Sequence, residues 1–91
     1  MSMAIYKYAV STSVDGGLVI VPKGAKVLQV LMQNGAPFLW AIVDTEEKKT
    51  EGRKFLILGT GQPFHRSDLQ HMTHITTFLD GPYVWHVFEW R

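Results

Sequence analysis

Four histidines are the side chains of this sequence best suited to proton transfer near neutral pH, and histidine also binds metals. His71 and His74 are three positions apart. On an α-helix this spacing would place both rings on one face, whereas on a β-strand it directs them to opposite faces. The motif HExxH is absent, and no group of histidine and acidic residues has the spacing of metal ligands. The sequence therefore predicts neither a metal site nor a cofactor.

Serine supplies the candidate nucleophiles, which are at positions 2, 11, 13 and 67. None lies in the strand–turn–helix context that holds a catalytic serine at the tip of a sharp turn. Catalytic triads assemble in space, so an enzyme stays open, but the pattern favours a protein without enzymatic activity. His86 lies within the apolar segment "YVWHVFEW" (83–90). We expect a half-buried ring with one hydrogen-bonded nitrogen, and a functional role is the alternative.

The segment "LGTGQP" (58–63) could present backbone N–H groups to an anion, because its small residues leave the backbone accessible. It lacks the spacing of a phosphate-binding P-loop, and a plain turn with glycine at positive φ is the favoured interpretation. Cationic side chains accompany it and the turn "VPKGAK" (21–26). They are Lys23, Lys26, Arg53, Lys54, His65 and Arg66. These side chains either form a cationic rim or only keep the protein in solution, and the second interpretation is the default.

The elements that position these residues follow from length and composition. The chain has 91 residues, a net charge of +1 and no cysteine, so we expect one domain over residues 1–91 that is stabilised by packing alone. This charge makes a nucleic-acid partner improbable. The longest apolar runs, at 38–43 and 55–58, are too short to cross a membrane as a helix, and residues 1–8 lack the apolar core of a signal peptide.

Short segments rich in Val, Ile, Thr and aromatic residues alternate with glycine, proline and asparagine, which predicts strands separated by turns. The expected strands span residues 5–12, 18–22, 26–33, 36–44, 54–61, 69–79 and 83–90, with a turn at "VDGG" (14–17) and loops at 45–53 and 62–68. A helix over residues 65–76 is the only competing interpretation, and its β-branched residues oppose it. The prediction is an all-β fold, a small antiparallel β-sandwich or partly open barrel of about seven strands.

Two tight hairpins are expected, at Asn34-Gly35 and at Asp80-Gly81, because these pairs favour turns with positive φ. Before the first turn, Leu28, Val30 and Met32 should share one face. The strand that follows is apolar on both faces, so we expect it to be central and covered on both sides.

The motifs "PKGAKVLQV", "QNGAPFLWAIVD", "GTGQP" and "VWHVFE" occur in this order over nearly the whole chain. In this pattern the sequence resembles a family of small, mostly uncharacterised proteins encoded by bacteriophages and prophages. The segment "MTHITT" departs from that pattern, where a glycine–threonine pair is expected. The resemblance implies a non-enzymatic phage accessory binding protein in the host cytoplasm. Its sharper form is a counter-defence protein that sequesters a small anionic nucleotide signal; an inhibitor of a host protein and a minor structural or assembly protein are the alternatives.

For the nucleotide hypothesis, the predicted ligand-binding residues combine charge, small residues and stacking groups. Charge would come from Lys26, Arg53 and Arg66; backbone and hydroxyl contacts from Thr60 and Gly61; stacking from Trp40 or His65. The chain has eleven aromatic residues, counted as five Phe, three Trp and three Tyr, which is many for so small a core. Trp85 and Trp90 should lie on opposite faces of the last strand. A homo-oligomer is therefore expected, with no membrane partner.

Overall fold

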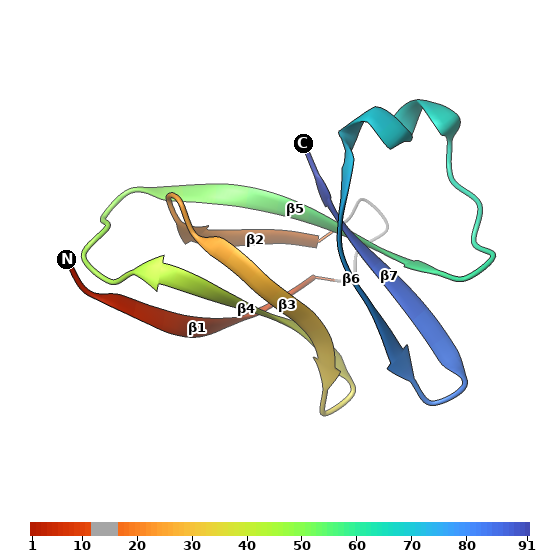
Figure 1. Cartoon of the computed structure of the whole chain (residues 1–91), viewed down its shortest axis with the longest axis horizontal. Helices are drawn as coiled ribbons and strands as arrows, with labels where there is room; N and C mark the ends of the chain where they lie inside the picture. Colours follow the sequence, from red (N-terminus) through yellow and green to blue (C-terminus); the bar gives the residue numbers. More distant parts are fainter. Residues whose placement is uncertain (12–16) are drawn as a thin grey trace.

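The computed structural model describes residues 1–11 and 17–91, which form seven β-strands in two antiparallel sheets (Figure 1). The elements are β1 (Met3–Ala9), β2 (Gly17–Pro22), β3 (Lys26–Gln33), β4 (Ala36–Asp44), β5 (Thr50–Gly59), a 3₁₀ helix (Arg66–His71), β6 (Met72–Asp80) and β7 (Tyr83–Trp90). The three-stranded sheet has the order β1-β4-β3, and the four-stranded sheet has the order β2-β5-β7-β6. The predicted all-β sandwich is confirmed, and it is not closed into a barrel.

The two sheets enclose one apolar core because alternate side chains of each strand point inward. The three-stranded sheet contributes Val30 from β3 and Leu39, Ala41 and Val43 from β4, all of which are fully or almost fully buried. The four-stranded sheet contributes valine and phenylalanine side chains from its inner face. These are Val19, Val21, Phe55, Phe78 and Val87. The N-terminus lies at one end of the long axis, and the β6–β7 hairpin with the 3₁₀ helix lies at the other (Figure 1).

Both predicted hairpins are present, and local turn chemistry explains each of them. Asn34 has φ 53° and Gly35 has φ 79°, as a tight turn with two left-handed central residues requires. In the second hairpin Asp80 pairs with Tyr83, so the two turn residues are Gly81 and Pro82, one position later than predicted. The expected turn at 14–17 lies, apart from Gly17 at the start of β2, outside the described residues.

Several predicted boundaries are wrong. β1 begins at Met3 and ends at Ala9, so it is shifted toward the N-terminus relative to the expected 5–12. β5 begins at Thr50, inside the expected loop 45–53, because residues 50–54 pair with β2. The glycine and the charged side chains of this segment do not prevent the pairing. Residues 66–71 form a 3₁₀ helix in place of the start of the expected strand 69–79, which begins at Met72, so the competing helical interpretation of 65–76 holds only for this short element.

The predicted alternation in β3 is wrong at Leu28, because a β-bulge interrupts the register there, whereas Val30 and Met32 share the inward face as predicted. Val27 pairs with Ala41 but Gln29 pairs with Trp40, so one residue of β3, Leu28, has no partner. A bulge of this kind adds one residue to a strand and moves the following side chains to the opposite faces. Leu28 is therefore exposed, whereas Val30 is fully buried.

Strand β4 is central in its sheet, as expected, but it is not covered on both sides. Its inward side chains, such as Leu39 and Ala41, are fully buried. Its outward side chains Phe38, Trp40 and Ile42 are only half-buried. The three-stranded sheet therefore has an outer face with partly exposed apolar side chains.

Candidate functional site

The sequence-predicted ligand residues lie in three separate places and do not form one site. Arg53 lies within β5 and points to the inner side of the four-stranded sheet, opposite Val19. Thr60, Gly61, His65 and Arg66 follow β5, and Arg66 begins the 3₁₀ helix. The remaining two, Lys26 and Trp40, share the outer face of the three-stranded sheet and are described last.

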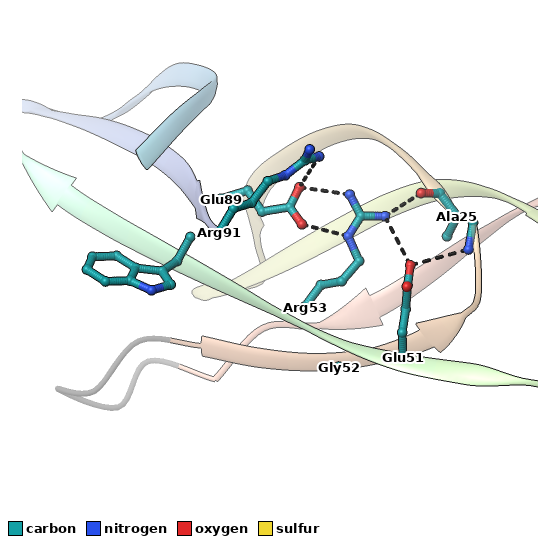
Figure 2. Close-up of a pocket in the computed structure, with 8 residues that line it drawn as sticks. Ala25, Glu51, Gly52, Arg53, Glu89 and Arg91 are labelled. Carbon is teal, nitrogen blue, oxygen red and sulfur yellow. Dashed lines mark hydrogen bonds and ion pairs between the residues drawn. The ribbon is translucent and has the colours of Figure 1, made fainter. Parts of the chain in front are cut away.

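Arg53 forms the centre of an ion-pair cluster that joins three segments of the chain (Figure 2). Its Nε donates to Glu89 Oε2 and its Nη2 donates to Glu89 Oε1, both at 2.7 Å, which is a bidentate pair between β5 and β7. Its Nη1 donates to the backbone oxygen of Ala25 in the β2–β3 turn and lies 4.0 Å from Glu51 Oε1. Most donors of the guanidinium are therefore already engaged.

Burial and charge explain the strength of this pair. The Glu89 side chain is only 5% exposed and the Arg53 side chain 14%. The hydrogen bonds from Arg53 lower the pKa of Glu89 below its usual value, against the opposing effect of burial. The same hydrogen bonds raise the pKa of Arg53 above its usual value. A buried bidentate pair of this type serves structure, because a ligand would have to break it to reach the guanidinium.

An open pocket of about 420 Å³ adjoins this cluster, between the β2–β3 turn and the ends of β5 and β7. Its charged lining consists of Glu51, Arg53, Glu89 and Arg91, two acids and two bases (Figure 2). Arg91 Nη2 lies 3.6 Å from Glu89 Oε1 and its side chain is 69% exposed. The charges balance within the pocket, so it offers no net attraction to an anion.

The segment after β5 is a turn whose backbone donors are largely used within the chain. Thr60 N–H donates to the backbone oxygen of Val84, and Gln62 N–H donates to that of Gly59. Gly61 has φ 86°, which explains the glycine. This geometry supports the plain turn over an anion-binding nest, because two of its amides already have partners.

A hydrogen-bonded chain of threonine and histidine side chains crosses the outer face of the four-stranded sheet, and the sequence did not indicate it. Thr60 Oγ1 lies 2.8 Å from His86 Nε2, and Thr77 Oγ1 lies 3.0 Å from His86 Nδ1. Thr77 Oγ1 also lies 2.9 Å from His74 Nε2. His86 is half-buried as predicted, but both of its ring nitrogens have partners rather than one. We name these four side chains the histidine ladder.

His71 and His74 lie against the same face of β7, so the prediction that they point to opposite faces is wrong. His71 stacks on Trp90 with ring centroids 4.8 Å apart, and His74 contacts Phe88 edge-on at 5.3 Å. Phe88 and Trp90 are two residues apart on one strand and therefore share a face. The reason is that His71 ends the 3₁₀ helix and is not part of the strand, so strand alternation does not apply to it.

Trp40 and Lys26 lie on the open outer face of the three-stranded sheet. Trp40 pairs with Lys7 of β1 on one side and with Gln29 of β3 on the other. Directly opposite residues of an antiparallel pair point to the same face, so these side chains flank the indole ring. Lys26 pairs with Ile42, the next outward residue of β4.

Phe38 completes this arrangement, two residues before Trp40 on the same face. The two ring centroids are 6.5 Å apart with an interplanar angle of 58°. Lys7 Nζ lies 4.7 Å from the centroid of Phe38 and donates to Gln33 Oε1 at 2.9 Å. We name Lys7, Lys26, Phe38 and Trp40 the aromatic platform. Lys7 and Phe38 were not among the predicted site residues, although strand alternation places Phe38 and Trp40 on one face.

Two further observations bear on the kind of site. Within residues 1–11 and 17–91, no group of three or more histidine, cysteine or acidic side chains could hold a metal ion. In the same part of the chain, no helix has the length and apolar character needed to cross a membrane.

Comparison with known proteins places the chain in a family. A family model described as a domain of unknown function, DUF7352, matches residues 1–91, so the chain belongs to this family over its whole length. A comparison with curated proteins and a comparison with solved structures each found no match.

Proposed function

We propose that this member of the DUF7352 family is a non-enzymatic binding protein that holds a small anionic nucleotide on its aromatic platform. The observation that carries the proposal is the placement of Phe38 and Trp40 on the central strand of an open sheet face, with Lys7 and Lys26 on the neighbouring strands. Aromatic rings on a sheet are stacking surfaces for nucleobases. Lysine ammonium groups beside them attract phosphate oxygens.

The charges on this face favour an anion. Lys7 pairs with Trp40, and Lys26 pairs with Ile42, midway between Trp40 and the acidic residue Asp44, so the two lysines outnumber the one acid along these strands. The Lys7 ammonium is held in place by Phe38 and Gln33, so little side-chain entropy is lost when it meets a phosphate. The pocket around Arg53 lacks this property because its bases are paired with acids.

A single nucleotide suits the platform better than a nucleic-acid polymer. Polymer binding requires a basic groove that follows the backbone, and this chain has a net charge of only +1. The phage accessory role in the host cytoplasm, and counter-defence as its purpose, are supported by the motif resemblance alone. We retain them as the biological setting of the proposal.

A protein partner is the second candidate for the same face. Met3 and Ile5 are 56% and 61% exposed, and Leu31 is also exposed, so the edges of the platform are apolar. Exposed apolar side chains around aromatic residues are typical of protein interfaces. This observation favours inhibition of a host protein by direct contact as the alternative function.

Calorimetric titration with a cyclic dinucleotide and with ADP-ribose tests the proposal. For the probe that binds, Trp40→Ala and Lys26→Glu should each weaken binding at least tenfold. Arg66→Glu is the matched control, because Arg66 lies on the 3₁₀ helix outside the three-stranded sheet. At a ligand concentration of one hundred times the Kd, the folded state should gain about 2.7 kcal/mol, which appears as a rise in melting temperature.

Three outcomes would contradict the proposal. If neither probe binds, the aromatic platform does not hold a nucleotide of these classes. If Arg66→Glu abolishes binding while Lys26→Glu does not, the site lies at the loop after β5. If the probe released by heating is chemically altered, the protein acts as an enzyme.

A further inference from the structure

We propose that two copies of this chain associate through the outer face of the four-stranded sheet. This face presents apolar side chains from all four strands, and we name it the dimer face. The side chains on which the argument depends are Leu18, Ile20, Leu56, Leu58, Leu79 and Phe88. The proposal is independent of what the aromatic platform binds, because the platform lies on the other sheet.

Strand register defines the dimer face. Leu56 pairs with Phe88 and Leu58 pairs with His86, while the intervening residues Phe55 and Val87 point inward and are buried. At one corner Leu18 and Ile20 are 59% and 55% exposed, and at the opposite corner Leu79 is 78% exposed. Apolar side chains therefore extend from edge strand β2 to edge strand β6, with polar residues between them at the centre of the face.

Gly52 lets the side chains of β2 pack down on this face. A β-carbon at Gly52 would lie 3.1 Å from Leu18 Cδ1 and 3.4 Å from Ile20 Cδ1. Both side chains therefore lie over the backbone of β5 and extend the apolar surface of the neighbouring strands. Apolar side chains that lie on a sheet face in this way can be excluded from water by a second sheet face.

The chain exposes more surface than a monomer of its size. Its accessible surface is 6161 Å², and a monomeric protein of 10.3 kDa has about 5,400 Å². The excess is about 800 Å², which equals the share that one partner buries in a standard interface. The radius of gyration of 13.6 Å likewise exceeds the roughly 12 Å of a compact domain of this length. The chain as a whole therefore exposes an excess of surface comparable to one side of a standard interface.

The low charge of the dimer face favours a second copy of the chain as its binding partner. Among the described residues of this face, Lys54 is the one permanently charged side chain, and its Nζ lies 5.3 Å from the centroid of the Trp90 ring. The titratable groups that face outward beside it are His71, His74 and His86. A two-fold axis brings each patch against its own copy, so a nearly uncharged face can pair without repulsion. The aromatic platform, with two lysines, would repel its own copy.

The histidine ladder makes this face suitable for burial. Both ring nitrogens of His86 have threonine partners, and His74 Nε2 shares the hydroxyl of Thr77. Polar groups with partners inside the chain cost little to bury, whereas unpartnered groups cost several kcal/mol. The polar residues at the centre of the face therefore do not prevent its contact with an apolar partner surface.

Sedimentation equilibrium over a wide concentration series tests the proposal. The wild-type chain should reach twice its monomer mass of 10.3 kDa. The double variant Leu18→Glu with Ile20→Glu should raise the dimer dissociation constant at least tenfold, because carboxylates would be buried against an apolar surface. Leu28→Glu is the matched control, because Leu28 is an exposed leucine on the other sheet, and it should leave the dimer intact.

Circular dichroism shows whether each variant is folded. If the double variant does not fold, Leu79→Glu replaces it, since this side chain is 78% exposed and contributes little to the monomer. A wild-type chain that stays monomeric at every concentration overturns the proposal. A dimer that survives the substitutions on the dimer face, or that is lost in Leu28→Glu, overturns it as well, because the contact then lies elsewhere.

Discussion

Replacing Glu89 with glutamine should destabilise the fold strongly, although the two side chains have nearly the same shape. Glu89 is 4% exposed and accepts two hydrogen bonds of 2.7 Å from Arg53. The substitution leaves the largely buried Arg53 charge with only the more distant Glu51, at 4.0 Å, as a counter-charge. Removing one partner of such a pair costs about 3–5 kcal/mol. We expect the lower end, roughly 3 kcal/mol, because the amide oxygen of Gln still accepts one hydrogen bond.

Urea unfolding followed by circular dichroism measures this loss, and a thermal melt should show a decrease of about 12–24 °C for a chain of this length. Glu46→Gln is the control, because Glu46 forms an exposed ion pair with the N-terminal amine at 3.2 Å and should have no measurable effect. The double variant Arg53→Met with Glu89→Leu should recover most of the stability, because it leaves no unpaired charge. If Glu89→Gln lowers the free energy of unfolding by less than about 1 kcal/mol, the reasoning is refuted, because a solvent-screened surface ion pair contributes no more than that.

The same ion pair sets a dependence of stability on pH. Arg53 holds the pKa of Glu89 in the folded chain below its unfolded value, which is near 4.3. The pair therefore contributes its full stability above that unfolded value, and the contribution is lost as the pH falls through the folded-state pKa. The free energy of unfolding of the wild-type chain should approach that of Glu89→Gln in acid. A difference that stays constant as the pH falls would contradict the assignment.

Two further predictions concern a turn and the histidine ladder. Gly35→Ala should lower the free energy of unfolding by about 1 kcal/mol in urea titrations, because Gly35 has φ 79°. Thr77→Val removes the hydroxyl shared by His86 and His74. The stability of the monomer should change little, because Thr77 is exposed in the monomer, but the dissociation constant of the proposed dimer should rise roughly tenfold in sedimentation equilibrium. If the free-energy losses of monomer folding and of dimer formation are equal, the histidine ladder is not part of the interface.

Local patterns were sufficient to predict the strands and the hairpins. The turn at Asn34-Gly35 depends on the conformational preferences of two adjacent residues, which sequence contains directly. Strand ends and faces were less predictable because they depend on the partner strand. The bulge at Leu28 arises from the pairing of β3 with β4, and β5 extends to Thr50 because β2 lies beside it. No feature of these segments alone contains that information.

The predicted site failed to assemble around Arg53 for a related reason. Sequence shows that Arg53 follows a run of charged residues, which is typical of a solvated loop. Its partner Glu89 is 36 positions away, and only the pairing of β5 with β7 brings the two together. A base can therefore be paired in the fold with an acid that is distant in the sequence, and charge alone does not identify a ligand site.

The sequence of β4 illustrates how a partly exposed apolar face can be mistaken for core. Apolar side chains on both sides of a strand are expected when the strand is covered by two layers. They are equally expected when one layer covers it and the other side binds a partner, and composition cannot distinguish the two cases. In the described part of this 91-residue chain, two sheets share one core, so each sheet also has an outer face. Phe38 and Trp40 lie half-buried on such a face, and our proposal is that a partner outside the monomer covers them, an anion toward which Lys7 and Lys26 direct positive charge.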